Sequence, residues 1–237
     1  MNQPDAPIVT ARGVLRTYRQ GQIEVPALRG VDLDIARGDF ASIAGPSGSG
    51  KTTLLNIIGG LDRPDGGHVT IEGEDITALG DNALADLRLR KIGFVFQDYN
   101  LIPVLSAVEN VEFILQLEGV GEEERRQRSL ALLSQVGLEG MESRRPARLS
   151  GGQQQRVAVA RALVSHPAIV LADEPTANLD THTANGLIDL MSELNAKLGI
   201  TFLMTTHDAR VIERTRRHIV LTDGRITSDQ PNLAPVA

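Results

Sequence analysis

The segment GPSGSGKT at residues 45–52 constrains the fold of this chain more than any other feature. It follows a short apolar run, Phe40–Ala44, and precedes an amphipathic stretch, so we expect a strand, a glycine-rich turn and a helix. In that context the pattern G-x-x-x-x-G-K-[ST] forms a loop whose backbone N–H groups hold phosphates. Lys51 would bring a compact positive charge to the phosphates, and the Thr52 hydroxyl would ligate Mg²⁺. The expected nucleotide contacts are Gly45, Pro46, Ser47, Gly48, Ser49, Gly50, Lys51, Thr52 and Thr53.

The lysine in this loop is an informative choice of residue. The chain has 24 Lys and Arg residues, but only Lys51, Lys91 and Lys197 are lysines. A glycine-rich turn that binds nothing is the alternative interpretation. With three lysines in the whole chain, a lysine would rarely fall at the motif's fixed position by chance, so that alternative is improbable.

Two further apolar runs end at polar residues. Ile169–Ala172 precedes Asp173 and Glu174, and Thr201–Thr205 precedes His207. Short, continuously apolar runs are typical of parallel strands buried on both faces, and open α/β sheets bind ligands at the carboxyl ends of such strands. Because neighbouring residues on a strand point to opposite faces, we expect Asp173 to hold Mg²⁺ and Glu174 to polarise an attacking water.

The order of patterns along the chain predicts an α/β fold. Alternating segments at 31–35 and 69–72 indicate a smaller, antiparallel sheet near the N-terminus. The stretch from about 98 to 155 shows helical periodicity and little strand character, so we expect an α-helical subdomain inserted in the core of one domain spanning 1–237. Its charge run favours a solvated helix face with the pairs Glu122–Arg126 and Glu124–Arg128.

Composition narrows the function classes. The 237 residues carry a formal net charge of −6 and no cysteine, which excludes disulfides, thiolate metal sites and cysteine nucleophiles and disfavours a general nucleic-acid binder. No apolar stretch approaches the roughly 20 residues that cross a bilayer, and residues 1–10 show no export signal. We therefore expect a cytosolic chain that does not span a membrane by itself.

A second glycine-containing helix start lies at Leu149–Gln153. Ser150 and Gln153 have the spacing of a capping box, and a well-capped helix would explain both. Gly151 and Gly152 lower helix propensity, which favours the close approach of an anion to this helix N-terminus. Both interpretations remain open at this point.

Together, LSGGQ at 149–153, the loop at 45–52 and the acids at 173 and 174 make the chain resemble an ATP-binding cassette (ABC) ATPase over nearly its whole length. The resemblance implies a P-loop NTPase (RecA-like) core, ATP and Mg²⁺ as ligands, and ATP hydrolysis. It also implies a head-to-tail homodimer in which Ser150 and Gly152 of one subunit, with their neighbours Gly151 and Gln153, reach the γ-phosphate held by the other.

Four other positions are similar to functional positions of that family. Tyr18 matches the aromatic residue that stacks on adenine, and Gln97 the glutamine that contacts Mg²⁺ and the water. Asp180 lies in the segment Asn178–Asp180, which resembles the loop that crosses to the partner's site. His207 matches the histidine that hydrogen-bonds the γ-phosphate.

Segments 24–35, 60–67 and 90–111 resemble the subfamily of macrolide-efflux and lipoprotein-releasing ATPases. That resemblance implies integral membrane permease subunits as partners, docked near Asp98–Val111, and a peripheral location on the cytoplasmic face of the inner membrane. A regulatory cassette without transport, such as the one that controls a periplasmic hydrolase in cell division, is the alternative. No nucleic-acid partner is expected, because Lys51 and Ser150 lie within 99 positions with no intervening coiled coil.

Overall fold

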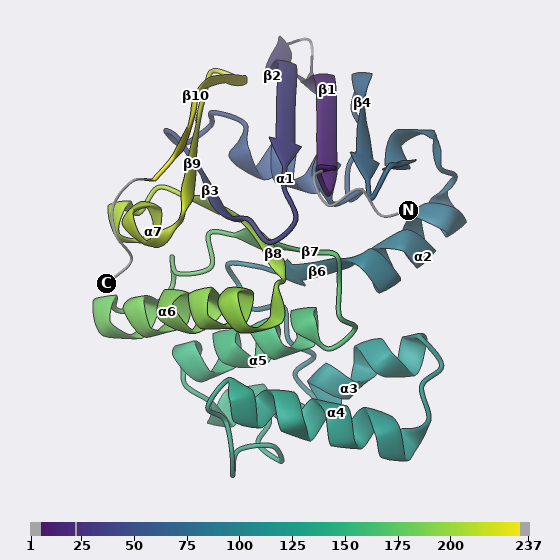
Figure 1. Cartoon of the computed structure of the whole chain (residues 1–237), viewed down its shortest axis with the longest axis vertical. Coiled ribbons are helices and arrows are strands. Elements are labelled where there is room, and N and C mark those ends of the chain that lie inside the picture. The colour runs from purple at the N-terminus through teal and green to yellow at the C-terminus, as the bar shows by residue number, and fades with distance from the viewer. Residues whose placement is uncertain (1–5, 22, 233–237) are drawn as a thin grey trace.

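The computed structural model describes residues 6–21 and 23–232. They form two sheets with helices on both sides of the larger one (Figure 1). The strands are β1 (Val9–Gln20), β2 (Ile23–Ile35), β3 (Phe40–Ala44), β4 (Gly66–Ile71), β5 (Glu74–Asp75), β6 (Ile92–Val95), β7 (Ile169–Asp173), β8 (Thr201–Thr206), β9 (Arg217–Thr222) and β10 (Arg225–Pro231). The helices are α1 (Lys51–Ile58), α2 (Asp81–Lys91), α3 (Ala107–Leu117), α4 (Glu122–Gln135), α5 (Gly151–Leu163), α6 (Thr181–Leu198) and α7 (Ala209–Arg214), with short 3₁₀ turns at Ile76–Ala78 and Pro146–Arg148.

The larger sheet has the strand order β10-β9-β3-β8-β7-β6. Every pair from β9 to β6 is parallel, and β10 joins β9 antiparallel through a hairpin. The carboxyl ends of β3, β7 and β8 therefore meet at one edge of the sheet. This is the edge at which the sequence placed the candidate site.

The smaller sheet, β2-β1-β4-β5, is antiparallel throughout and lies at the top of Figure 1. The predicted α/β class with an N-terminal antiparallel sheet is confirmed. Helices α3, α4 and α5 lie between β6 and β7 in the chain, at the bottom of the same view.

Two apolar clusters hold these layers together. In β7, Val170 and Ala172 pack into the cluster beneath helices α3–α6, whereas Ile169 and Leu171 pack into the cluster shared with α1 and the small sheet. Successive strand residues point to opposite faces, so a run buried on both sides has to be apolar at every position. This explains why β7 is apolar at every position from Ile169 to Ala172.

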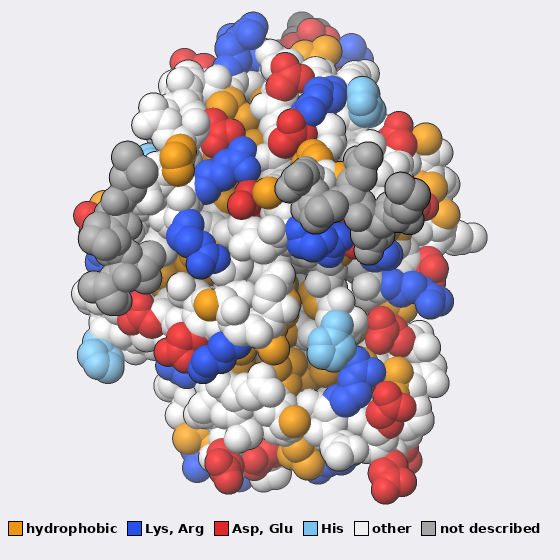
Figure 2. All heavy atoms as spheres, in the orientation of Figure 1, with side chains coloured by type: hydrophobic (Ala, Val, Ile, Leu, Met, Phe, Trp, Pro, Cys, Tyr) orange, Lys and Arg blue, Asp and Glu red, His pale blue; other side chains and the backbone are white. Residues whose placement is uncertain are grey.

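The charge run of α4 is only partly as predicted. Arg128 lies 3.5 Å from Glu124, as expected, but Arg126 pairs across to Glu112 of α3 at 3.2 Å instead of with Glu122. The expectation for Arg126 was wrong because it considered neighbours on one helix and not the helix packed beside it. Acidic and basic side chains are interspersed over the face in Figure 2, which carries no continuous basic surface.

Among the residues that the structure describes, no helix is both long and apolar enough to cross a membrane.

Candidate functional site

The turn between β3 and α1 is built to receive an anion. Gly50, the N-cap of α1, has a φ of 104°, and its missing side chain is necessary because a Cβ there would lie 2.5 Å from the Ala27 carbonyl oxygen. No side chain caps the first turn of α1, and that turn contains no acidic residue. The N–H groups at this helix start are therefore left for an external acceptor.

Lys51 brings an unpaired positive charge to the same turn. Its side chain is buried, with 8% of the residue exposed, and Nζ donates to the carbonyl oxygens of Gly45 and Pro46 at 2.9 and 3.0 Å. No carboxylate of the described residues lies within ion-pair distance of Nζ, and the buried Oγ of Ser49 has no hydrogen-bond partner among them either. A buried ammonium without an acid is costly unless an anion binds beside it. The turn therefore fits a phosphate.

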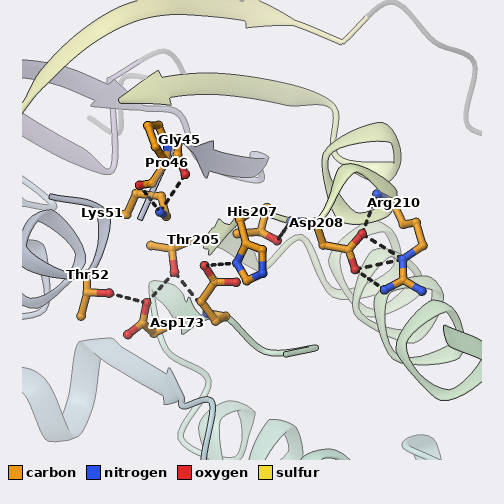
Figure 3. A network of polar contacts seen from close by, with 11 residues as sticks. Gly45, Pro46, Lys51, Thr52, Asp173, Thr205, His207, Asp208 and Arg210 are labelled. Atoms are coloured by element: carbon orange, nitrogen blue, oxygen red, sulfur yellow. Dashed lines mark hydrogen bonds and ion pairs between the residues drawn. The ribbon is translucent and has the colours of Figure 1, made fainter. Parts of the chain in front are cut away.

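Hydroxyl and carboxylate oxygens gather beside this turn (Figure 3). Thr52 Oγ1 and Thr205 Oγ1 donate to the same carboxylate oxygen of Asp173, at 3.1 and 2.5 Å. Hard oxygen ligands of this kind, one or two from the protein with the rest from phosphates and water, are what Mg²⁺ prefers. The donor set fits the expected Mg²⁺, and Thr52 and Asp173 are brought together as predicted.

Gln97 makes no hydrogen bond to that cluster among the described residues. It is exposed in the turn after β6, and its backbone oxygen accepts a hydrogen bond from Asn178 Nδ2 at 3.1 Å. No hydrogen bond among the described residues joins its side chain to Thr52 or Asp173.

Glu174 has an unusual backbone conformation. Its φ of 46° lies in the left-handed region, which costs a residue of this type on the order of 1–3 kcal/mol. The conformation is held by its own N–H, which donates to Thr205 at both the carbonyl oxygen (3.2 Å) and Oγ1 (3.1 Å). Strain of this kind persists where surrounding contacts over-determine it, and it concentrates at functional sites.

His207 faces Glu174 from the end of β8. Its Nδ1 lies 2.9 Å from Glu174 Oε1. The His207 side chain is 69% exposed, whereas that of Glu174 is 15% exposed. The two predicted groups are thus in direct contact, and the open imidazole can still reach a second group.

Tyr18 and Glu174 share one open pocket of about 340 Å³ with the phosphate turn. The Tyr18 hydroxyl donates to Asp62 at 2.7 Å, and the guanidinium of Arg16 lies 4.8 Å from the centre of the ring. An aromatic ring beside the phosphate turn is consistent with the stacking role expected for Tyr18.

The helix start at Ser150 lies outside that pocket. Ser150 and Gln153 form the predicted capping box, with Gln153 N 3.3 Å from Ser150 Oγ and Ser150 N 3.0 Å from Gln153 Oε1. The two glycines have a cause within the chain: a Cβ at Gly152 would lie 2.2 Å from Thr183 Cγ2, and one at Gly151 would lie 2.7 Å from the Tyr99 hydroxyl. The glycines therefore do not by themselves indicate an anion.

Asp180 begins α6. Its carboxylate accepts hydrogen bonds from His182 N at 3.0 Å, Thr183 N at 3.1 Å and Thr183 Oγ1 at 2.6 Å. The hydrogen bonds from the Thr183 hydroxyl and N–H lower the pKa of Asp180 below its ordinary value. A contact with a second subunit would have to be made by a carboxylate that already caps a helix.

Sequence reasoning missed Thr205, which is fully buried and bonds both Asp173 and Glu174. The available signal was the pair of threonines that ends strand β8, directly after the apolar residues Phe202–Met204.

Comparison with known proteins gives consistent results. Residues 28–177 match the sequence profile of the family described as ABC transporter. The lipoprotein-releasing system ATP-binding protein LolD of Anaeromyxobacter dehalogenans is 50% identical over 234 residues, covering 98% of this chain and 98% of that protein. The macrolide export ATP-binding/permease protein MacB of Syntrophobacter fumaroxidans is 44% identical over 238 residues, covering 97% of this chain but 33% of that protein.

A solved structure of similar fold is the ATP-binding cassette MJ0796, described as a dimer in a post-hydrolysis state bound to ADP and Pi. It superposes with a TM-score of 0.87 at 45% identity, covering 94% of this chain and 98% of that one.

Proposed function

Because the chain belongs to the ABC transporter family, as an ATP-binding and ATP-hydrolysing subunit, we propose a specific role in hydrolysis for each residue of the candidate site. The observation that supports this proposal best is the buried ammonium of Lys51, which has no acidic partner among the described residues and lies at the uncapped start of α1. Triphosphate oxygens would satisfy both the charge and the N–H groups. Residues 45–53 thus cradle the β- and γ-phosphates of ATP.

Thr52, Asp173 and Gln97 hold Mg²⁺ in this proposal. Bound Mg²⁺ would neutralise charge on the phosphate oxygens during transfer of the γ-phosphoryl group to water. Thr205 keeps the Asp173 carboxylate turned toward Thr52 through its 2.5 Å hydrogen bond. Glu174 accepts the proton of the attacking water, and His207 orients Glu174 and donates to the γ-phosphate.

The site of one chain is completed by a second copy. The adenine stacks on Tyr18, and residues 150–153 of the other copy approach the γ-phosphate with the N-terminus of α5. The loop that ends at Asp180 crosses between the copies. This assembly is supported by the separation of Ser150 from the Lys51 pocket within one chain and by the dimeric state described for MJ0796.

Steady-state phosphate release tests the hydrolytic roles. Replacing Glu174 by Gln removes the proton acceptor and keeps the shape of the side chain, so we expect turnover to fall by about 10²–10⁴-fold. Glu193→Gln is a matched control, because Glu193 lies on the surface of α6 and, among the residues that the structure describes, pairs with Lys197 alone. Wild-type turnover in Glu174→Gln would refute the role of Glu174.

We further propose that a membrane permease docks in a groove of about 460 Å³ on the α2, β6, α3 and α5 side of the molecule. Its lining is mostly apolar, Val104 nearby is 70% exposed, and no Asp or Glu lines it. From the segment 98–111 only Asn100 and Ile102 line the groove, so the docking surface extends well beyond that segment. The MacB relative is named an ATP-binding/permease protein, and this chain covers 33% of that protein.

In this proposal the chain is a peripheral subunit on the cytoplasmic face of the membrane, and the permease is of the export type named for its relatives. The chain is one domain in this proposal, with residues 98–155 as a helical subdomain that contributes Asn100, Ile102, Phe113 and Ile114 to the groove. A charge placed in an apolar groove should prevent docking. We expect Phe113→Asp to abolish co-sedimentation with vesicles made from the source cell's own membranes, whereas Leu117→Asp, on the same helix but outside the groove, retains it. Equal binding by both variants would contradict this docking site.

A further inference from the structure

Gln155 is a buried polar side chain to which the hydrolytic roles give no function. It lies in the middle of α5 and is 0% exposed. Its Nε2 donates to the carbonyl oxygen of Pro175 at 2.8 Å and to that of Phe96 at 3.2 Å. Phe96 immediately precedes Gln97, and Pro175 immediately follows Glu174. One amide group therefore joins the backbones beside two residues of the candidate site.

The chemistry at this junction requires an amide nitrogen. Both partners are carbonyl oxygens, which only accept hydrogen bonds, so the NH₂ end of Gln155 has to face them. Its Oε1 is buried and accepts no hydrogen bond among the described residues. Glutamate at this position would direct a carboxylate oxygen at two carbonyls, and an apolar side chain would leave both without this donor.

The junction also bears on the strained conformation of Glu174. On the β8 side, Glu174 is held through its N–H by Thr205. On the other side, the next residue is held through its carbonyl oxygen by Gln155. The left-handed φ of Glu174 thus lies between two anchors, of which one comes from the sheet and the other from α5.

The loop after β6, which contains Phe96 and Gln97, and the loop after β7, which contains Pro175 and Asn178, are also joined by a second set of hydrogen bonds that does not involve Gln155. Asn178 Nδ2 bonds the Gln97 carbonyl oxygen and Asp98 Oδ1, both at 3.1 Å, on the exposed side of the loops. These bonds join the loops to each other but not to a helix. Among the described residues, Gln155 bonds both loops to α5, whose N-terminus holds residues 150–153. Arg161 of the same helix bonds the first loop alone, at the carbonyl oxygens of Tyr99 and Asn100 (3.0 and 2.5 Å).

We propose that Gln155 is a positioning residue, which sets the conformation of Glu174 and couples the position of helix α5 to the proton acceptor of the same chain. The proposal rests on the role of Glu174 given above. A displacement of α5 when its N-terminus meets the nucleotide of a second copy is transmitted through Gln155 to Pro175 and so to Glu174. Each chain would in this way adjust its own hydrolytic group to the occupancy of the other site.

The test compares Gln155→Met with Gln154→Met in the purified chain. Methionine keeps the length of the side chain and its helix propensity and removes the amide. Gln154 is the matched control, since among the described residues its Nε2 bonds the Leu149 carbonyl oxygen alone. We expect Gln155→Met to lower kcat by roughly tenfold to a hundredfold, the loss typical of a misplaced reacting group, with the KM for ATP within about twofold of wild type. Gln154→Met should match wild type in both.

A second readout separates positioning from general support of α5. In the Glu174→Gln background, Gln155→Met should leave ATP-dependent dimer formation unchanged in light scattering, because the N-terminus of α5 is intact. Wild-type kcat in Gln155→Met would overturn the proposal, and so would a joint loss of kcat, ATP affinity and dimer formation. If Gln155→Met does not fold, Gln155→Asn, which withdraws the amide by one methylene, is judged by the same criteria. Normal turnover in Glu174→Gln would refute the role of Glu174 and with it the coupling to hydrolysis, whereas wild-type kcat in Gln155→Met with impaired Glu174→Gln would refute the role of Gln155 alone.

Discussion

The contact between Gly152 and Thr183 allows a quantitative test of why the start of α5 contains glycine. In the structure a Cβ at Gly152 would lie 2.2 Å from Thr183 Cγ2, far inside the roughly 3.5–4 Å of an ordinary carbon contact. The threonine methyl cannot easily turn away, because Oγ1 of the same side chain donates to Asp180 Oδ2 at 2.6 Å. The perturbation we consider is Gly152→Ala, alone and together with Thr183→Ser.

Two opposing free-energy terms set the change in stability that Gly152→Ala should cause. Overpacking costs about 1–3 kcal/mol, and we place this site at about 2–3 kcal/mol because the threonine is tied in place. Replacing glycine by alanine in a helix contributes about 1 kcal/mol of stability. Gly152→Ala should therefore destabilise the chain by about 1–2 kcal/mol, which lowers Tm by roughly 2–8 °C in a chain of this size.

Thr183→Ser removes the methyl and keeps the hydroxyl that bonds Asp180. In that background the clash is absent, and Gly152→Ala should raise stability by up to about 1 kcal/mol. Thermal unfolding of the four proteins, followed by circular dichroism without nucleotide, measures the difference. If Gly152→Ala shifts Tm equally in both backgrounds, packing against Thr183 is not the reason for this glycine and the reasoning is refuted.

Two further predictions concern residues of the site. Hydrogen bonds from Thr183 lower the pKa of Asp180, so the stability that its carboxylate contributes is fully present above the ordinary Asp pKa of about 3.9 and is lost as the pH falls through the lowered value. In urea unfolding, Asp180→Ala should be less stable than wild type at pH 7, and the difference should shrink steadily as the pH is lowered below about 3.9. A difference independent of pH would contradict this. Asparagine tolerates the left-handed region better than glutamate. Glu174→Asn should therefore be about 1 kcal/mol more stable than wild type in urea unfolding, while its ATP turnover falls. Unchanged or lower stability would show that the backbone at this position is not strained.

Local pattern predicted the elements that bind phosphate. The strand predicted at 40–44 is β3 with the same bounds, because an apolar run closed by a glycine-rich turn has few other folds available. The turn at 45–52 and Asp173 were expected at one edge of the sheet because the carboxyl ends of parallel strands share it, and Thr52 Oγ1 indeed donates to Asp173. In these elements, backbone geometry determines both the sequence pattern and the place in the fold of the residues that bind phosphate.

Side-chain packing between distant segments could not be predicted in this way. Thr183, the neighbour that requires glycine at 152, lies 31 positions further along the chain, and Arg126 prefers an acid on another helix. Gln155 appears in the sequence as one of three consecutive glutamines, and only its burial distinguishes it from the other two. Periodicity encodes which face of a helix is apolar, but it carries no information about which carbonyl groups a buried amide will meet.

Completion of the ATP site by a second copy of the chain is the central claim of this account. Light scattering of Glu174→Gln at saturating Mg²⁺ and ATP tests it most directly, because that variant should bind ATP without consuming it. We predict the mass of two chains with ATP, and the mass of one chain when Ser150→Arg is added to block the approach of α5 to the nucleotide. A single-chain mass for Glu174→Gln with bound ATP would contradict the claim.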